Sequence, residues 1–245
     1  MTVRLRQVAL VVRDLPAVSD EVAGSLGVEA CAHDLHVEQF GLHNALFPVG
    51  EGLLELVSPF RDGTTAGRFL DQCGGDAGYM VLFQVDDLEA VRGRVAGLGV
   101  RVVLEVAQPG IVGLHLHPRD LGGAIVSVDQ TDRWDDWPWA GANWRDHVRT
   151  DLVSGLATVE VAVAEPEAAA ERWAAVLGVD AVGAAVPLDE GEVCFVSAED
   201  RIEHISGLEL WASRHEDLVI GGVEMALRPR RAAHGRSDEG GGPAA

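Results

Sequence analysis

Apolar and polar positions alternate along the chain in a pattern that predicts the same set of elements three times. Each set opens with a strand-like apolar run, followed by apolar residues at helical spacing that stop at a glycine. Further short apolar runs, separated by turn residues, predict three more strands in each set. The opening strands and helix-ending glycines are 4–12 with Gly27, 79–85 with Gly99, and 156–163 with Gly178. The pattern therefore predicts three βαβββ units.

The spacing inside these units is regular. The intervals are 20 residues from Gln7 to Gly27, 19 from Met80 to Gly99 and 20 from Thr158 to Gly178. Agreement across three units indicates an internal repeat. The remaining strands are expected near 36–41, 43–48 and 52–58, near 100–106, 111–117 and 123–128, and near 192–197, 207–212 and 222–227.

A tryptophan-rich segment separates the second unit from the third. Four of the six tryptophans of the chain lie in it, at Trp134, Trp137, Trp139 and Trp144. A solvated linker does not carry so many large aromatic side chains, so we expect it to pack across the protein or at a subunit interface. The expected organisation is a two-unit domain at 1–130, this connector at 131–150, a third unit at 151–230 and a disordered tail at 231–245.

Composition and charge exclude several classes of protein. The 245 residues are 47% apolar, and no apolar run is long enough for a membrane span. The net charge of −20 would repel nucleic acid and anionic membranes, so neither is an expected partner. Three widely separated cysteines favour free thiols in a reducing compartment, and the first residues lack the pattern of a signal peptide. We therefore expect a cytoplasmic protein.

Two histidines stand near the end of a predicted strand. His115 and His117 are two residues apart, so in a strand both side chains leave from one face. Pro118 ends the strand, and the residues up to Gly123 form a turn before the next strand. The pair is either part of a catalytic site or a set of satisfied polar residues beside a turn, and the sequence leaves both interpretations open.

The motifs of the first two units resemble those of the vicinal oxygen chelate superfamily, which includes glyoxalase I, methylmalonyl-CoA epimerase, extradiol dioxygenases and bleomycin-resistance proteins. The similar stretches are Gln7-Val-Ala-Leu-Val-Val-Arg-Asp-Leu-Pro, Phe83-Gln-Val-Asp-Asp-Leu-Glu-Ala and His117-Pro-Arg-Asp-Leu-Gly-Gly-Ala-Ile-Val-Ser. The resemblance implies an α+β fold in which two βαβββ units pair and their curled sheet forms a cleft, here accompanied by the third unit. It also implies one divalent metal in that cleft.

The metal positions of this superfamily correspond to Gln7 and Glu55 in the first unit and to Met80 and Ser127 in the second. The internal spacings, 48 and 47 residues, agree with this register. Catalytic metals prefer histidine and carboxylate ligands, and only Glu55 is a strong one. We therefore favour a protein without the usual metal. A divalent metal held by Gln7, Glu55, His115 and His117 stays open as an alternative.

Glu55 is the leading candidate for chemistry, because it is a lone acid in an apolar strand and occupies a cleft position in the superfamily register. His115, His117 and Tyr79 are the other candidate catalytic residues. Gln7, Asn44 and Arg68 are candidate substrate-binding residues, Arg68 through its planar fork. A surface role for Arg68 and a core role for Tyr79 are equally compatible with the sequence.

Two classes of function follow. The first is an isomerase or lyase in which Glu55 removes a proton next to a carbonyl of a small oxygenated metabolite. The second is a metal-free binding or sequestering protein of the bleomycin-resistance type. A dioxygenase is disfavoured, because its Fe(II) centre needs two histidines and a carboxylate. Because three units leave one unpaired, we also expect a homodimer.

Overall fold

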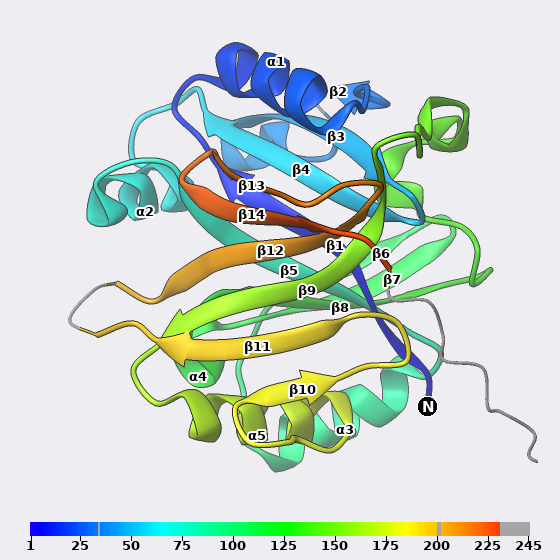
Figure 1. Ribbon diagram of the computed structural model, residues 1–245. Coiled ribbons are helices and arrows are strands. Elements are labelled where there is room, and N and C mark those ends of the chain that lie inside the picture. The colour runs from blue at the N-terminus through cyan, green and yellow to red at the C-terminus, as the bar shows by residue number, and fades with distance from the viewer. Residues whose placement is uncertain (34, 200–201, 231–245) are drawn as a thin grey trace, which may run out of the picture.

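The computed structural model describes residues 1–33, 35–199 and 202–230, and the expected tail at 231–245 lies outside them. It is a mixed α+β protein built on one curled 14-stranded sheet (Figure 1). The path of paired strands runs β10-β11-β9-β12-β5-β1-β4-β3-β2, and two further groups of strands branch from β5 and β12. No helix of the described part is long and apolar enough to cross a membrane.

The first unit has the predicted order. Its elements are β1 (Val3–Val11), α1 (Leu15–Leu26), β2 (Ala32–His33), η1 (Glu38–Phe40), β3 (Leu42–Val49) and β4 (Gly52–Pro59). Asp14 accepts a hydrogen bond from the Ala17 N–H and caps α1, which ends at Gly27 with φ of 64°. The strand expected at 36–41 is wrong, because the short 3₁₀ helix η1 occupies that stretch. β4 runs parallel to β1 and antiparallel to β3.

The second unit follows the short helix α2 (Thr65–Cys73) and repeats the pairing of the first. Its elements are β5 (Ala77–Val85), α3 (Leu88–Gly97), β6 (Val102–Gln108), β7 (Ile111–Leu116), α4 (Pro118–Leu121) and β8 (Ile125–Thr131). β8 runs parallel to β5 and antiparallel to β7. β5 and β1 pair antiparallel, which joins the two units into the expected curled sheet.

The last part of the chain contains the third unit and three additional strands. Its elements are β9 (Val153–Val163), α5 (Pro166–Leu177), β10 (Ala185–Pro187), β11 (Glu192–Ser197), β12 (His204–Ala212), β13 (Glu216–Ile220) and β14 (Val223–Arg228). β11 is parallel to β9 as β4 is to β1, so the third unit ends at β11. β12 pairs antiparallel with β9, and β14 runs parallel to β12. Strands β12–β14 therefore have the pairing of a fourth unit without a helix.

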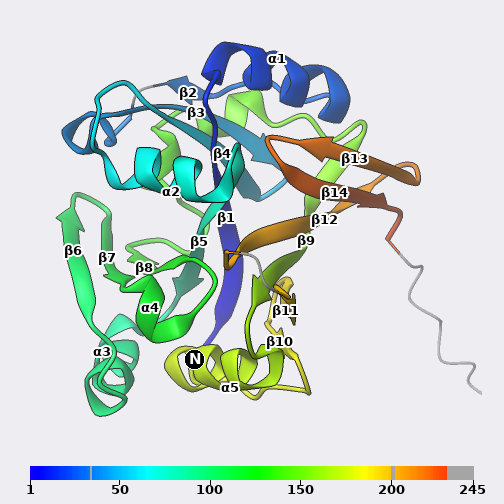
Figure 2. The same cartoon turned by 90° about the vertical axis from the view of Figure 1, so that its left-hand side faces the viewer.

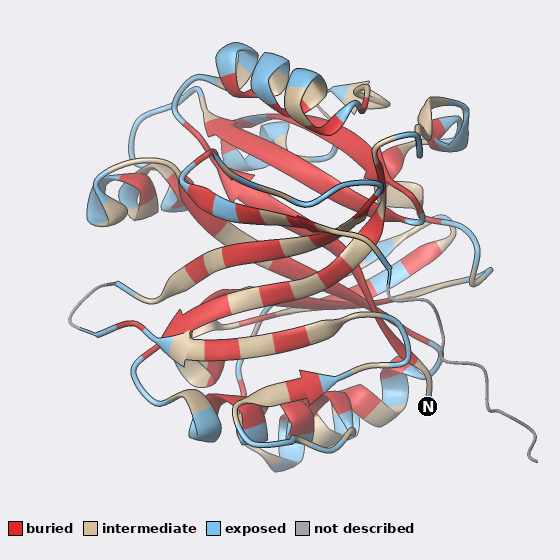
Figure 3. Ribbon diagram, viewed as in Figure 1, coloured by how far each residue is buried: buried red, intermediate tan, exposed pale blue. Residues whose placement is uncertain are grey.

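The two halves share one apolar core. Alternate residues of β1, β5, β9 and β12 enter the same buried cluster as helices α1, α3 and α5. Trp173 of α5 contacts both halves, because its ring lies 6.0 Å from Phe83 and 5.2 Å from Phe195. Figure 2 shows the two groups of strands side by side, and Figure 3 shows buried and partly exposed residues alternating along β9, β11 and β12.

The apolar face of the third unit is thus covered within the chain. Its residues Val159, Val161, Val163, Phe195 and Leu210 are all buried. The unpaired unit that motivated the expectation of a homodimer is not present, since β9 pairs with β12 as β1 pairs with β5. The homodimer itself stays a prediction.

The tryptophan-rich connector packs across the protein, as one of the two expectations held. It contains the 3₁₀ helices η2 (Pro138–Ala140) and η3 (Trp144–His147). Trp137 and Trp144 form a second buried cluster with Leu46, Leu53, Leu82 and Ile111 of the first two units. The connector therefore covers the side of this sheet that faces away from the shared core. We call this side the inner face; its residues include Gln7, Glu55, Leu82 and Ser127.

Candidate active site

Glu55 of β4 is held between two amide side chains on the inner face. Asn44 Nδ2 donates to Glu55 Oε1 at 2.7 Å, and Gln7 Nε2 donates to Oε2 at 2.8 Å. Glu55 is only 8% exposed, so it does not point into bulk water. Burial raises the pKa of Glu55, and the two hydrogen bonds oppose that shift. A raised pKa makes the Glu55 carboxylate a stronger base than an ordinary glutamate.

Both amides are fixed by further hydrogen bonds. Gln7 Oε1 accepts from the indole N–H of Trp137 at 2.7 Å. Asn44 accepts from the Leu35 N–H at 3.0 Å and donates to the Leu35 carbonyl at 3.1 Å. Each amide therefore has a set orientation, with its NH₂ group directed at Glu55. The connector takes part in the site through Trp137.

The second unit adds a histidine and an acid to the inner face. In the β7–β8 ladder His115 lies opposite Ser127, and Gly113 lies opposite Asp129. Burial lowers the pKa of His115 to about 4 and raises the pKa of Asp129 to about 7. Within the described residues, His115 Nε2 and Asp129 Oδ2 have no hydrogen-bond partner.

Asp129 was not among the sequence candidates. Its Oδ1 accepts from the indole N–H of Trp139 at 3.3 Å, so it too contacts the connector. The alternation in β8 offers the only sequence signal, because Asp129 shares the inward-facing parity of Ser127 while Val126 and Val128 enter the shared core. An acid at the end of a predicted strand is typical of an exposed turn, so the sequence did not indicate that Asp129 is buried.

His117 does not join His115, so the expectation that they share a strand face is wrong. β7 ends at Leu116, and His117 instead caps the four-residue helix α4. Its Nδ1 accepts from the Arg119 N–H at 3.1 Å. The hydrogen-bonded cap gives His117 a structural contact away from the ladder that carries His115.

Arg68 belongs to α2 and Tyr79 packs against that helix, so neither joins the hydrogen-bonded set of Glu55. Tyr79 packs against Phe69 with ring centroids 5.4 Å apart, and burial raises the pKa of its hydroxyl to about 12. Arg68 is exposed, and its guanidinium donates to the Gly63 carbonyl at 2.5 Å and to Thr65 Oγ1 at 3.1 Å. Of the seven sequence candidates, hydrogen bonds join Gln7, Asn44 and Glu55.

The donors at the superfamily metal positions do not fit a divalent cation. Gln7 already uses its carbonyl oxygen for Trp137 and its NH₂ group for Glu55. Met80 offers a soft thioether and Ser127 a neutral hydroxyl, which are poor ligands for a hard metal. The described residues also contain no group of three or more histidine, cysteine or acidic side chains placed to hold a metal ion. The chemistry proposed below therefore uses no metal ion.

Comparison with known proteins agrees with this architecture. A family model described as a glyoxalase-like domain matches residues 8–177. The chain therefore belongs to the glyoxalase-like domain family, within the vicinal oxygen chelate superfamily.

Curated relatives match about half of the chain. The ethylmalonyl-CoA/methylmalonyl-CoA epimerase of Cereibacter sphaeroides is 28% identical over 131 residues, which are 52% of this chain and 97% of the relative. The mitochondrial methylmalonyl-CoA epimerase of Bos taurus is 25% identical over 130 residues, 52% of this chain and 74% of the relative.

A solved structure resembles the protein over nearly its whole length. The hypothetical protein from Staphylococcus aureus superposes with a TM-score of 0.72 at 13% identity, and the match covers 93% of this chain and 99% of that one. This likeness shows a shared fold that includes both halves.

Proposed function

We propose that this protein is an epimerase or isomerase that moves a proton at the carbon next to a carbonyl of a small oxygenated metabolite. Glu55 is the acid–base group. In its carboxylate form it takes the proton from that carbon. The electron pair of the C–H bond then forms the carbon–carbon double bond of an enolate, and the π electrons of the carbonyl move to its oxygen. Return of a proton from a second acid or from water to the opposite face of that carbon gives the epimer, and return to a different position gives an isomer; neither needs an oxidant or reductant.

The observation that carries this proposal is the double amide clamp on Glu55. Hydrogen bonds of 2.8 Å from Gln7 and 2.7 Å from Asn44 hold both carboxylate oxygens. They orient the carboxylate and oppose the rise in its pKa that burial causes. The two amides are positioning residues in this proposal.

In this proposal His115 stabilises the enolate. Because burial keeps its pKa near 4, the imidazole is neutral at physiological pH and carries one N–H. Its Nε2 has no hydrogen-bond partner within the described residues, so that nitrogen is available to donate to an oxyanion in the corresponding tautomer. The epimerase relatives support this class of reaction, since their names specify inversion next to a thioester carbonyl.

Proton exchange tests the proposal directly. Methylmalonyl-CoA incubated with the protein in D₂O should lose its 2-proton signal in NMR, and Glu55→Gln should slow that exchange by about 100-fold or more, the usual contribution of a general base. Glu105→Gln, which changes an exposed glutamate of β6, is the matched control and should exchange at the wild-type rate. Absence of exchange with the wild-type protein, or full exchange with Glu55→Gln, would contradict the assignment.

The same assay addresses the alternative of a metal-free binding protein. That function is favoured by the aromatic connector over the inner face, where Trp137 and Trp144 form an apolar cluster. A sequestering protein would bind the thioester by calorimetry and leave its 2-proton in place.

A further inference from the structure

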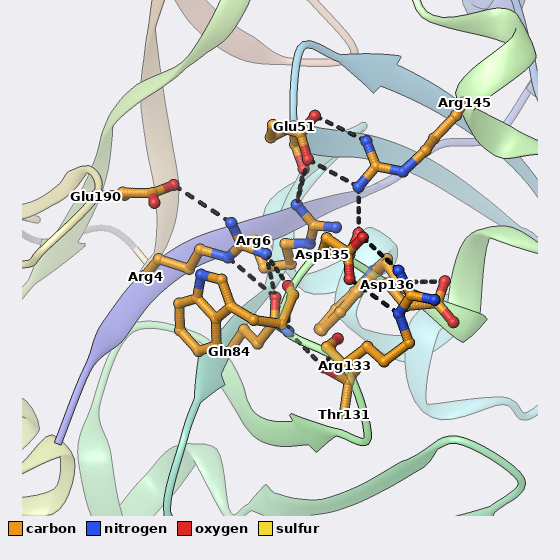
Figure 4. Close-up of polar contacts among 12 residues, drawn as sticks. Arg4, Arg6, Glu51, Gln84, Thr131, Arg133, Asp135, Asp136, Arg145 and Glu190 are labelled. Carbon is orange, nitrogen blue, oxygen red and sulfur yellow. Dashed lines mark hydrogen bonds and ion pairs between the residues drawn. The ribbon is translucent and has the colours of Figure 1, made fainter.

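A groove between the two halves, separate from the Glu55 site, collects positive charge. It has a volume of about 590 Å³ and is lined by Arg4 and Arg6 of β1, Glu51 of the β3–β4 turn, Glu190 of the β10–β11 loop, Trp211 of β12 and Arg230. Figure 4 shows the guanidinium groups of Arg4, Arg6 and Arg145 gathered near Glu51 and Glu190. Neither the comparisons nor the proposed reaction gives this groove a role.

Arg6 is the unusual member of this cluster, because it is fully buried and its hydrogen bonds are incomplete. Nη1 donates to the Glu51 carbonyl and lies 3.7 Å from the Glu51 carboxylate. Nε and Nη2 have no hydrogen-bond partner within the part of the chain that the structure describes. Buried polar groups are normally paired, so unpaired donors on a cation point to an absent acceptor.

The aromatic contacts of Arg6 compensate only part of this deficit. Its guanidinium carbon lies 5.3 Å from the ring centres of both Trp137 and Trp144, which are cation–π distances. Such contacts do not use the N–H donors. Burial and the neighbouring Arg4 lower the pKa of Arg6 to about 9, so its surroundings disfavour the cation.

The charges around the groove leave an excess of cations. Among the residues that line the groove, Arg4, Arg6 and Arg230 face two acids, Glu51 and Glu190, so the local balance is +3 − 2 = +1 in a chain whose total is −20. Glu190 lies 3.5 Å from Arg4, and the side chains of Glu190 and Glu51 are 59% and 56% exposed. Both acids are therefore at the rim. Glu51 is also held by Arg145 through hydrogen bonds of 2.9 and 3.1 Å, so Glu190 is the acid that can turn into solvent.

We propose that this groove binds the phosphoryl group of a phosphorylated small molecule. A phosphate supplies the negative charge that this excess of cations lacks, and its oxygens match the planar fork of arginine. The phosphoryl group takes the place beside Arg4 that Glu190 now occupies, next to Arg6. Trp211 is partly exposed and lines the groove, so the organic part of the ligand packs against this indole, next to Arg230 at 5.9 Å.

Calorimetric titration of the full chain tests the proposal, with inorganic phosphate, AMP and adenosine as probes. Phosphate and AMP should bind competitively, and their affinity should fall as ionic strength rises. Adenosine, which lacks the phosphoryl group, should bind about tenfold more weakly than AMP or not at all. Equal binding of adenosine and AMP would overturn the phosphoryl assignment.

Variants distinguish a binding site from a structural cluster. Arg6→Gln should weaken phosphate binding about tenfold or more, with folding verified by circular dichroism. Glu190→Gln removes an exposed competing charge and should tighten binding about threefold, which a purely structural role would not produce. Arg13→Gln is the matched control, because Arg13 follows the opposite end of β1 from Arg4 and pairs with the exposed Asp71 of α2.

Two results would overturn the proposal. One is no heat of binding for either the wild type or Glu190→Gln at about 10 mM phosphate, a concentration that detects millimolar affinity. The other is wild-type affinity in a folded Arg6→Gln protein. Glu55→Gln should bind phosphate like the wild type, so the outcome is independent of the proton-transfer reaction.

Discussion

Asp129 is a buried acid that contributes to the pH dependence of the stability of this protein. Its carboxyl group is inaccessible to solvent, and its pKa rises from the ordinary 3.8 to about 7. Between these two pH values the folded state binds more protons than the unfolded state. Stability therefore decreases as pH rises through this window, because ionised Asp129 is costly to bury.

Asp129→Asn should remove this dependence, because asparagine has the same shape and does not titrate. The unfolding free energy of the variant minus that of the wild type should increase by about 2 to 3 kcal/mol between pH 5 and pH 8. Urea unfolding at the two pH values measures it. His115, whose pKa is lowered to about 4, contributes with the opposite sign, but it is present in both proteins and cancels in the difference. An equal difference at pH 5 and pH 8 would show that Asp129 titrates normally.

Some site residues could be predicted from the sequence, and others could not because their burial depends on residues far away in the chain. Glu55 and Gln7 could be predicted, because the repeat places them 48 residues apart in matching strands and they hydrogen-bond in the fold. Arg6 could not. Arg4-Leu5-Arg6 is typical of an exposed strand edge, but a register shift between Leu5 and Gln7 and the distant Trp137 bury Arg6. His117 was misplaced because Pro118 starts a helix instead of a turn.

At the scale of elements, the two halves of the sheet meet where β5 pairs with β12. Gly78 lies opposite Ile205 there, and a Cβ at Gly78 would overlap the Ile205 side chain and carbonyl. Glycine is needed for this close approach of two backbones. The join between the halves is therefore sensitive to a single methyl group.

Gly78→Ala should destabilise the protein by about 1 to 3 kcal/mol, the usual cost of overpacking. Gly24→Ala is the matched control: Gly24 lies on the exposed side of α1 with no atom within 4 Å of an added Cβ. Alanine there should stabilise the protein by about 0.5 to 1 kcal/mol. Thermal melts of both variants measure the two effects. A neutral Gly78→Ala would mean that β5 and β12 can separate without loss.

The elements themselves were largely predictable where local chemistry marks both ends. Asp14 and Gly27 delimit α1, and the strands of the first two units follow the expected register. The short strands β10 and β13 carry too few residues for a periodic pattern. The strands expected at 207–212 and 222–227 are present as β12 and β14, but only pairing across the sheet shows that they form a separate unit.

On the scale of the whole molecule, the chain behaves as one body because its halves share a core. The residues of β1 and β5 that point away from the inner face are buried against β9, β12 and α5. The family model spans residues 8–177 and so includes β9 and α5, and these elements cover the core-facing side of the first two units.

A chain truncated to residues 1–150 should therefore fail to fold on its own. The deletion exposes the apolar face that β9, β12 and α5 cover, which favours aggregation. The measurements are soluble yield and the cooperativity of thermal unfolding, relative to the full chain. A cooperative melt of the truncated protein near that of the full chain would show instead that the first two units form an autonomous domain.

The predicted homodimer is a separate question. Light scattering on the full chain checks it.

The connector also gives the molecule a built-in optical signal. Four of the six indoles lie in it, and Trp137 is bonded to Gln7 at 2.7 Å, one side chain away from Glu55, while its ring faces the Arg6 cation. Indole emission shifts to longer wavelength in a wetter environment and is altered by a nearby charge. The native fluorescence spectrum therefore responds to changes at the N–H of Trp137, near Glu55, and to changes at its ring, near Arg6. A ligand beside Glu55 and an anion beside Arg6 can each be followed without any added dye.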